Sequence, residues 1–168
     1  TDVDKFLNDM KKKLIKSTKF DRYDIKNPAV KQEVQSMDRL KSKCDDFGLE
    51  FKFHDTHASS IDCVINDKNI QCKTTSAASS NSAYTVGLCK RNIGKIVPYS
   101  DTDGIDFIII EIIAYQNTFY IIPIDVLTEK GFIHTETKRG KTRITVPIPN
   151  SKGQHWMNNY INRFDLLE

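Results

Sequence analysis

Apolar residues recur along the chain at two spacings, which separate helices from strands. Steps of three and four residues run through residues 2–17 and again through residues 27–48. The second segment has a cap at each end, because Asn27 suits a helix start and Gly48 suits a helix end. Helices are therefore predicted over about 2–17 and after Asn27. On the second helix, Glu33 lies at the edge of the apolar stripe, directed toward the body of the protein.

Alternation of apolar and polar residues predicts strands over most of the remaining chain. These predicted strands cover residues 49–53, 61–65, 70–75, 83–88, 106–114, 118–123 and 142–146. A short turn or helix is expected at 125–131 and a closing helix at 151–164. This order predicts one α+β domain over 1–168, with a mixed central sheet flanked by helices in a sandwich-like arrangement. Residues 1–26 form an N-terminal helix and linker, and 27–130 form the core.

Composition narrows the class of protein. The 168 residues are 39% hydrophobic and 28% charged, and no apolar run reaches the length of a membrane span. No apolar leader opens the chain. The four cysteines lack the C-x-x-C spacing of a zinc site, and we interpret them as reduced thiols in an intracellular protein.

The strands 61–65 and 70–75 are joined by residues 66–69, which are rich in turn formers, and should form a β-hairpin. In that register Asp62 lies directly opposite Lys73 on one face, with Gln71 diagonal to Asp62. One interpretation is an ordinary cross-strand ion pair. The other is a reactive site, with Glu33 supplying a second carboxylate from the helix.

The hairpin carries a resemblance to a known group of enzymes. Ile61-Asp62-Cys63-Val64 followed by Ile70-Gln71-Cys72-Lys73-Thr74-Thr75 resembles the core of the PD-(D/E)XK nuclease superfamily, whose fold is restriction-endonuclease-like. Two positions depart from its pattern: Ile61 stands where a proline is usual, and Gln71 where an acid is usual. The later segments 97–99, 106–109, 119–124 and 126–127 resemble strands of small homing- and restriction-type members, so the similarity covers roughly 27–130.

This resemblance implies a metal-dependent endonuclease that hydrolyses phosphodiester bonds in DNA. Asp62 would be the central ligand of Mg²⁺, with Mn²⁺ as an alternative ion, Glu33 would support that ion, and Gln71 would add a carbonyl oxygen. Lys73 would orient the attacking water or stabilise the developing charge. RNA stays open as a substrate, and a homodimer would supply the two sites needed to cut both strands.

Net charge is only +3, but it is unevenly distributed. Residues 74–100 contain three basic residues and no acid, and residues 132–148 contain four basic residues and one acid. These two segments predict a phosphate-binding surface, although solvated surface is the plainer interpretation. The hydroxyl-rich loop 74–82 also suits phosphate binding. The basic candidates are Lys90, Arg91, Lys95, Lys138, Arg139, Lys141 and Arg143.

Two other functions stay open at this point. Gln71 and the missing proline favour a catalytically silent nucleic-acid-binding domain that keeps the nuclease fold. A structural or protein-interaction domain, in which the motif residues are incidental, is the third hypothesis.

Overall fold

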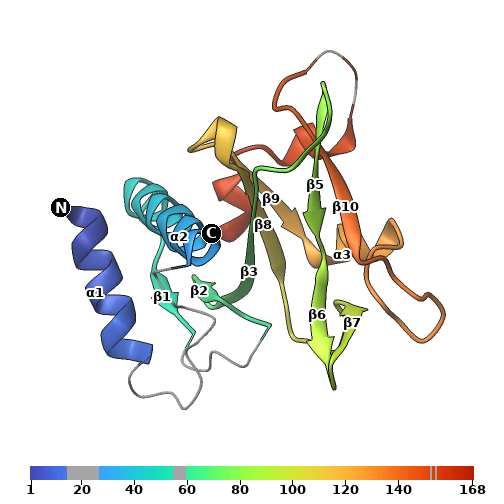
Figure 1. The fold of residues 1–168 in the computed structure, drawn as a ribbon, viewed down its shortest axis with the longest axis horizontal. Helices are drawn as coiled ribbons and strands as arrows, with labels where there is room; N and C mark the ends of the chain where they lie inside the picture. Colours follow the sequence, from blue (N-terminus) through green and yellow to red (C-terminus); the bar gives the residue numbers. More distant parts are fainter. Residues whose placement is uncertain (15–26, 55–59, 152, 154) are drawn as a thin grey trace.

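A five-stranded mixed sheet forms the centre of the protein (Figure 1). The computed structural model describes residues 1–14, 27–54, 60–151, 153 and 155–168. Strand β3 pairs in parallel with β8, whereas the other neighbouring pairs are antiparallel. The predicted α+β class is therefore confirmed. The strands, in spatial order, are β1 (Phe51–Phe53), β2 (Cys63–Ile65), β3 (Lys68–Thr75), β8 (Phe107–Ile112) and β9 (Phe119–Pro123).

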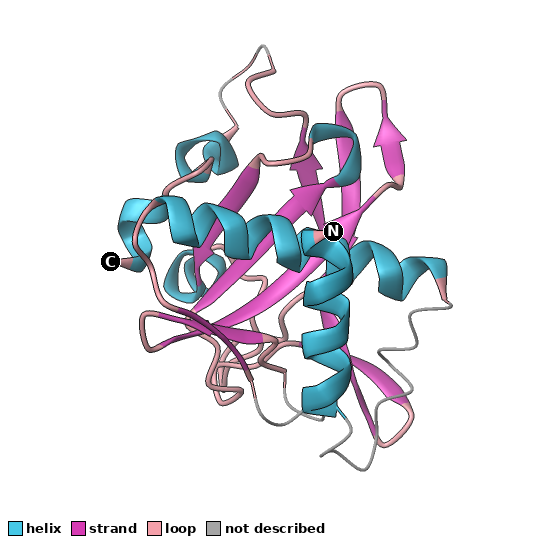
Figure 2. Cartoon of the chain, turned by 90° about the vertical axis from the view of Figure 1, so that its left-hand side faces the viewer, coloured by secondary structure: helices cyan, strands magenta, loops and turns pink. Residues whose placement is uncertain are grey.

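Two helices, α1 (Asp2–Leu14) and α2 (Pro28–Asp46), cover one face of this sheet (Figure 2). α2 begins where predicted, because the Asn27 side chain accepts a hydrogen bond from the backbone N–H of Ala29 at 3.0 Å. It ends before Gly48, whose φ of 68° favours glycine. The apolar sides of both helices and one face of the sheet form a continuous hydrophobic cluster.

A second layer covers the opposite face. It contains a three-stranded sheet in the order β10-β5-β4 and a two-stranded ribbon, β6–β7, which the sequence analysis did not predict. Because both faces of the central sheet are covered, strand β8 is buried at every position. The remaining elements are β4 (Ala78–Ser80), β5 (Ala83–Gly87), β6 (Cys89–Asn92), β7 (Lys95–Pro98), the 3-10 turn η2 (Ile113–Tyr115), helix α3 (Ile124–Glu129) and β10 (Arg143–Pro147).

The predicted closing helix at 151–164 is wrong. The described part of this segment forms short 3-10 turns, η3 (Trp156–Tyr160) and η4 (Phe164–Leu167). Asn162 interrupts any helix, because its φ is 51° and its backbone N–H donates to Phe119 O at 2.7 Å. The end of the chain therefore bonds to the edge of β9 while its aromatic side chains pack into the core.

Some other predictions are changed by the structure. The segment 15–17, the predicted end of the first helix, lies outside the described residues. The segment 74–82, predicted as a loop, instead contributes the last residues of β3 and the exposed strand β4. No helix among the described residues is long and apolar enough to cross a membrane.

Candidate active site

The β2–β3 hairpin turns more tightly than predicted. Asn66 and Asp67 have φ values of 47° and 65°, and these two residues alone form the turn. The pairing is therefore shifted by two residues from the predicted one, and continuing it places Asp62 level with Gln71 instead of Lys73. A shift of two preserves the faces, so Asp62, Gln71 and Lys73 still share one side of the hairpin.

The side chains of Asp62 and Gln71 are buried and held by the backbone of β3. Asp62 Oδ2 accepts a hydrogen bond from the backbone N–H of Cys72 at 2.9 Å. Gln71 Nε2 donates to the carbonyl oxygen of Cys72 at 3.1 Å. Only 8% of Asp62 and 5% of Gln71 are exposed. Both polar groups are thus fixed at one point of the strand.

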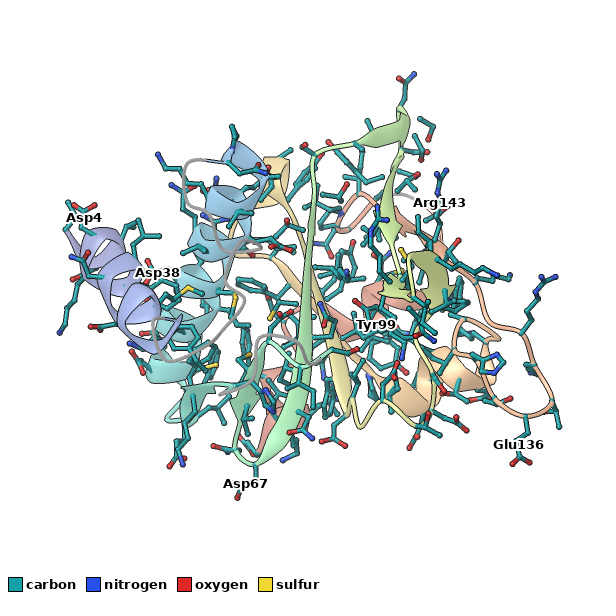
Figure 3. The ribbon with its side chains drawn as sticks, turned by 60° about the horizontal axis from the view of Figure 1, so that its bottom comes forward. Asp4, Asp38, Asp67, Tyr99, Glu136 and Arg143 are labelled. Carbon is teal, nitrogen blue, oxygen red and sulfur yellow. The ribbon has the colours of Figure 1, made fainter. Side chains whose placement is uncertain are left out.

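Lys73 lies against an aromatic residue that the sequence analysis did not assign to the site. Its Nζ is 5.3 Å from the ring centroid of Tyr99, which is buried (Figure 3). Burial acts to lower the pKa of Lys73, but Tyr99, Asp62 and Glu33 outweigh it, and the pKa is raised from its usual 10.5. Lys73 is therefore protonated at neutral pH. Burial also raises the pKa of Tyr99, against the opposing effect of Lys73.

Glu33 lies close enough to act on this site electrostatically. It is exposed near the start of α2, and its negative charge helps to raise the pKa of Lys73. The pKa of Cys72 is raised by its hydrogen bond with Cys63 and by burial, with Asp62 and Glu33 adding to the shift. The helix and the hairpin, distant in sequence, therefore place two carboxylates where their charges act on the same lysine.

Comparison with known sequences places the chain in a family. It matches the sequence model of a family described as MepB-like over residues 54–156, which is more than half of its length. The chain belongs to the MepB-like family. The matched segment contains Asp62, Gln71, Lys73 and Tyr99, whereas Glu33 lies outside it.

The MepB-like fold is similar to solved structures of low sequence identity. A bacterial homing endonuclease, I-Ssp6803I, aligns with a TM-score of 0.56 and 14% identity over 80% of this chain and 88% of that one. The crystal structure of MepB aligns with a TM-score of 0.49 and 20% identity over 56% of this chain and 70% of that one. No curated protein matches the chain. The likeness to the homing endonuclease agrees with the restriction-endonuclease-like fold implied by the hairpin motif.

The oxygen donors of this MepB-like site suit a hard divalent cation. Asp62 and Glu33 offer carboxylates, and Gln71 carries an amide oxygen. Within the described ranges no three His, Cys, Asp or Glu side chains are grouped to hold a metal ion. Asp62, Glu33 and Gln71 would therefore leave several coordination positions of an ion to water, an arrangement that suits Mg²⁺.

The predicted basic residues lie on two segments that meet beside the site. In the 132–142 loop, His134 N donates to Tyr99 O at 2.8 Å, and Leu88 N donates to Thr142 O at 2.8 Å. Gly140 lets the loop pack closely against His134, because a Cβ at position 140 would lie only 2.7 Å from His134 N. A pocket of about 570 Å³ is lined by both the ribbon and the loop.

The exposure of these basic residues differs. Lys90 forms an ion pair with Asp103, so its charge is partly neutralised. The other six are exposed, and Figure 3 shows Arg143 and Glu136 on the side of the protein that carries the loop. They are Arg91, Lys95, Lys138, Arg139, Lys141 and Arg143.

Proposed function

We propose that this MepB-like protein is a metal-dependent nuclease that hydrolyses phosphodiester bonds in DNA. The observation that carries the proposal is the convergence of buried Asp62 and Gln71 with protonated Lys73, within the electrostatic reach of Glu33. Titratable groups with perturbed pKa values and charged partners are typical of reactive sites. The fold shared with a homing endonuclease supports this class of reaction, although the likeness itself concerns only the fold.

The reaction needs a nucleophile and neutralisation of charge. A water oxygen forms a bond to phosphorus while the bond to the bridging oxygen breaks. The water loses a proton to solvent, and the leaving oxygen gains one. Mg²⁺ or Mn²⁺, when bound, supplies a Lewis acid that neutralises the phosphate and lowers the pKa of bound water. Asp62, Glu33 and the amide oxygen of Gln71 are the groups that would hold it.

The role of Lys73 follows from the direction of its pKa. A lysine that stays protonated at neutral pH cannot take a proton from water, so Lys73 acts as a cation and hydrogen-bond donor. It stabilises the charge that develops on the non-bridging phosphate oxygens. Tyr99 positions the Lys73 side chain through its ring face.

The exposed basic residues of the ribbon and of the 132–142 loop would bind the DNA backbone through phosphates. Arg91 and Lys95 belong to the ribbon. Lys138, Arg139 and Lys141 belong to the loop, and Arg143 belongs to β10. Removing one phosphate contact should lower the slope of log K against log salt by about 0.9 for a duplex. Lys90 contributes less, because it is paired with Asp103.

A catalytically silent DNA-binding domain is the second candidate. It is favoured by the hydrogen bond of Gln71 to Cys72 O, which ties the side chain to the protein, and by the neutral amide in place of an acid. Both candidates predict DNA binding, so binding alone does not separate them.

A cleavage assay on supercoiled plasmid DNA separates them. The wild-type protein should nick the plasmid in Mg²⁺ or Mn²⁺ and leave it intact in EDTA, whereas Asp62→Asn should be inactive. Accumulation of nicked circles before linear product indicates one site acting at a time, and direct linearisation indicates a dimer. Folded protein that binds the plasmid without cutting it in either ion would favour the silent domain.

A further inference from the structure

The β6–β7 ribbon exposes apolar side chains where a soluble surface usually carries polar ones. Across the described residues only three large hydrophobic side chains are exposed, and two of them belong to this ribbon. Ile93 is 96% exposed and Ile96 is 58% exposed. The ribbon projects at the lower edge of the molecule in Figure 1, away from α1 and α2. Two exposed apolar side chains thus lie three positions apart in the chain at the end of the ribbon.

Ile93 is also held in an unfavourable backbone conformation. Its φ is 50°, and together with Gly94 at 75° it forms the two-residue turn at the tip. This left-handed region is rare for β-branched residues, and Asn or Gly would be the favoured occupant. Neither the exposure nor the backbone conformation of Ile93 stabilises the fold, and residues of this kind are common at functional sites.

The charge around the tip favours a polyanion as the partner. The sequence contains no acidic residue between Asp67 and Asp101. Arg91 and Lys95, both exposed, lie on either side of the turn. Arg91 pairs with Ile96 across the ribbon, so one face presents a cation beside an apolar group.

The base of the ribbon lies at the candidate active site. Cys89 pairs with Pro98 where the two strands begin and end, and the next residue, Tyr99, contacts Lys73. A duplex gripped by the ribbon would therefore be held beside the residues proposed to cut it.

We propose that the β6–β7 ribbon enters the major groove of duplex DNA. Ile93 and Ile96 contact base edges, while Arg91 and Lys95 contact phosphates. The major groove admits a two-stranded ribbon, and apolar side chains there contact thymine methyl groups. This assignment takes its ligand from the proposed function, and it adds an element that grips the groove.

The test measures binding without cleavage. A fluorescein-labelled DNA duplex of mixed sequence is titrated in EDTA and followed by fluorescence anisotropy over a series of salt concentrations. Ile93→Asn should weaken binding about tenfold by removing a buried apolar contact, with an unchanged salt slope. Its melting temperature should stay the same or rise, because Asn tolerates the positive φ. Ile93→Leu, which keeps an apolar tip, should bind nearly as wild type does.

Charge variants complete the design. Arg91→Gln should lower the salt slope by about 0.9. Lys52→Gln is the matched control, since Lys52 is exposed on β1 at the far edge of the central sheet, and it should leave the slope unchanged. Unchanged affinity of Ile93→Asn would overturn the proposal. So would dissociation of a wild-type dimer by this variant in sedimentation experiments, which would make the tip a self-association surface.

The two proposals can fail separately. If neither the wild-type protein nor any variant cuts the plasmid, but Ile93→Asn still binds DNA more weakly, the proposed nuclease activity is wrong and the proposed role of the ribbon is retained. If cleavage requires Asp62 while the Ile93 variants bind DNA as the wild type does, the proposed nuclease activity is retained and the proposed role of the ribbon is wrong.

Discussion

Two charged clusters occupy neighbouring strands of the central sheet and are built in opposite ways. Glu111 on β8 pairs in register with Thr74, the residue that follows Lys73. It is only 1% exposed, and Arg39 Nε donates to its two oxygens at 3.1 and 3.2 Å while Nη2 donates at 2.6 Å. The backbone N–H of Asn117 adds a further bond at 2.9 Å. This carboxylate is fully engaged by the protein.

The cluster around Lys73 is only partly enclosed. Glu33 is exposed, Lys73 is half-buried, and the groups around the ammonium come from a hairpin, a helix and the end of the ribbon. A closed bidentate pair fixes α2 to the sheet, whereas half-buried Lys73 and exposed Glu33 can still meet a ligand. Buried charge therefore serves stability in one cluster, and in the other it is proposed to serve chemistry.

The largest effect is expected from Lys73→Met, which sharpens this contrast. Loss of the cation should lower the rate of plasmid cleavage about 10³-fold, equivalent to about 4 kcal/mol of transition-state stabilisation. The melting temperature should fall only slightly, because Lys73 is half-buried and the Asp62 carboxylate that it leaves behind keeps its hydrogen bond from the Cys72 N–H. Cleavage kinetics and thermal unfolding on one preparation check both parts. Near wild-type turnover would remove Lys73 from the site.

Arg39→Met should instead lower the stability of the protein and leave its cleavage rate unchanged. It leaves Glu111 buried without its partner, which costs about 3 kcal/mol of unfolding free energy. The rate of cleavage per folded molecule should be retained. Urea denaturation measures the loss, and Arg39→Met combined with Glu111→Leu should recover part of it. A loss below about 1 kcal/mol would show that this pair behaves like a surface ion pair.

Gln71→Glu should strengthen divalent-cation binding, roughly tenfold, because it adds a charge to the proposed ligands. Without metal the new carboxylate is buried, so the variant should be less stable than wild type, and added Mg²⁺ should raise its melting temperature more. Isothermal calorimetry with Mg²⁺ and Mn²⁺ provides the measurement. Weaker binding than in wild type would place Gln71 away from the ion.

The smallest effect concerns pH. Because the pKa of Lys73 is raised in the folded protein, its charged form contributes stability at neutral pH, and this contribution is lost only as pH rises through that raised value. Tyr99→Phe keeps the ring but removes the hydroxyl that helps to raise the pKa. In the pH–rate profile of cleavage, the alkaline limb should therefore move to lower pH. An alkaline limb at the wild-type position would show that the Tyr99 hydroxyl does not act on Lys73.

The sequence predicts local features better than distant contacts. Helix α2 could be predicted because its cap, apolar stripe and terminal glycine are all local. Asp62, Gln71 and Lys73 could be assigned to one face because alternation alone decides it, even though the predicted register is wrong by two residues. Three of the four residues in Asn66-Asp67-Lys68-Asn69 are turn formers, so the pattern does not show where the chain reverses.

Contacts between distant segments could not be predicted. Nothing near Glu111 in the chain indicates that Arg39 pairs with it, and nothing near Tyr99 indicates that it lies against Lys73. The ribbon could not be predicted because its two turn signals, Asn92 and Gly94, are separated by an isoleucine. The closing helix failed because the Asn162 backbone bonds to β9, which no local periodicity reveals.

The most direct test of the proposed reaction site compares Lys73→Met with Arg39→Met in one experiment. Plasmid cleavage and chemical unfolding are measured on the same preparations. We expect Lys73→Met to be nearly as stable as the wild type and inactive, and Arg39→Met to be clearly less stable and active while folded. Cleavage by Lys73→Met at the wild-type rate in saturating Mg²⁺ would contradict the proposal that the cluster around Lys73 is the reaction site.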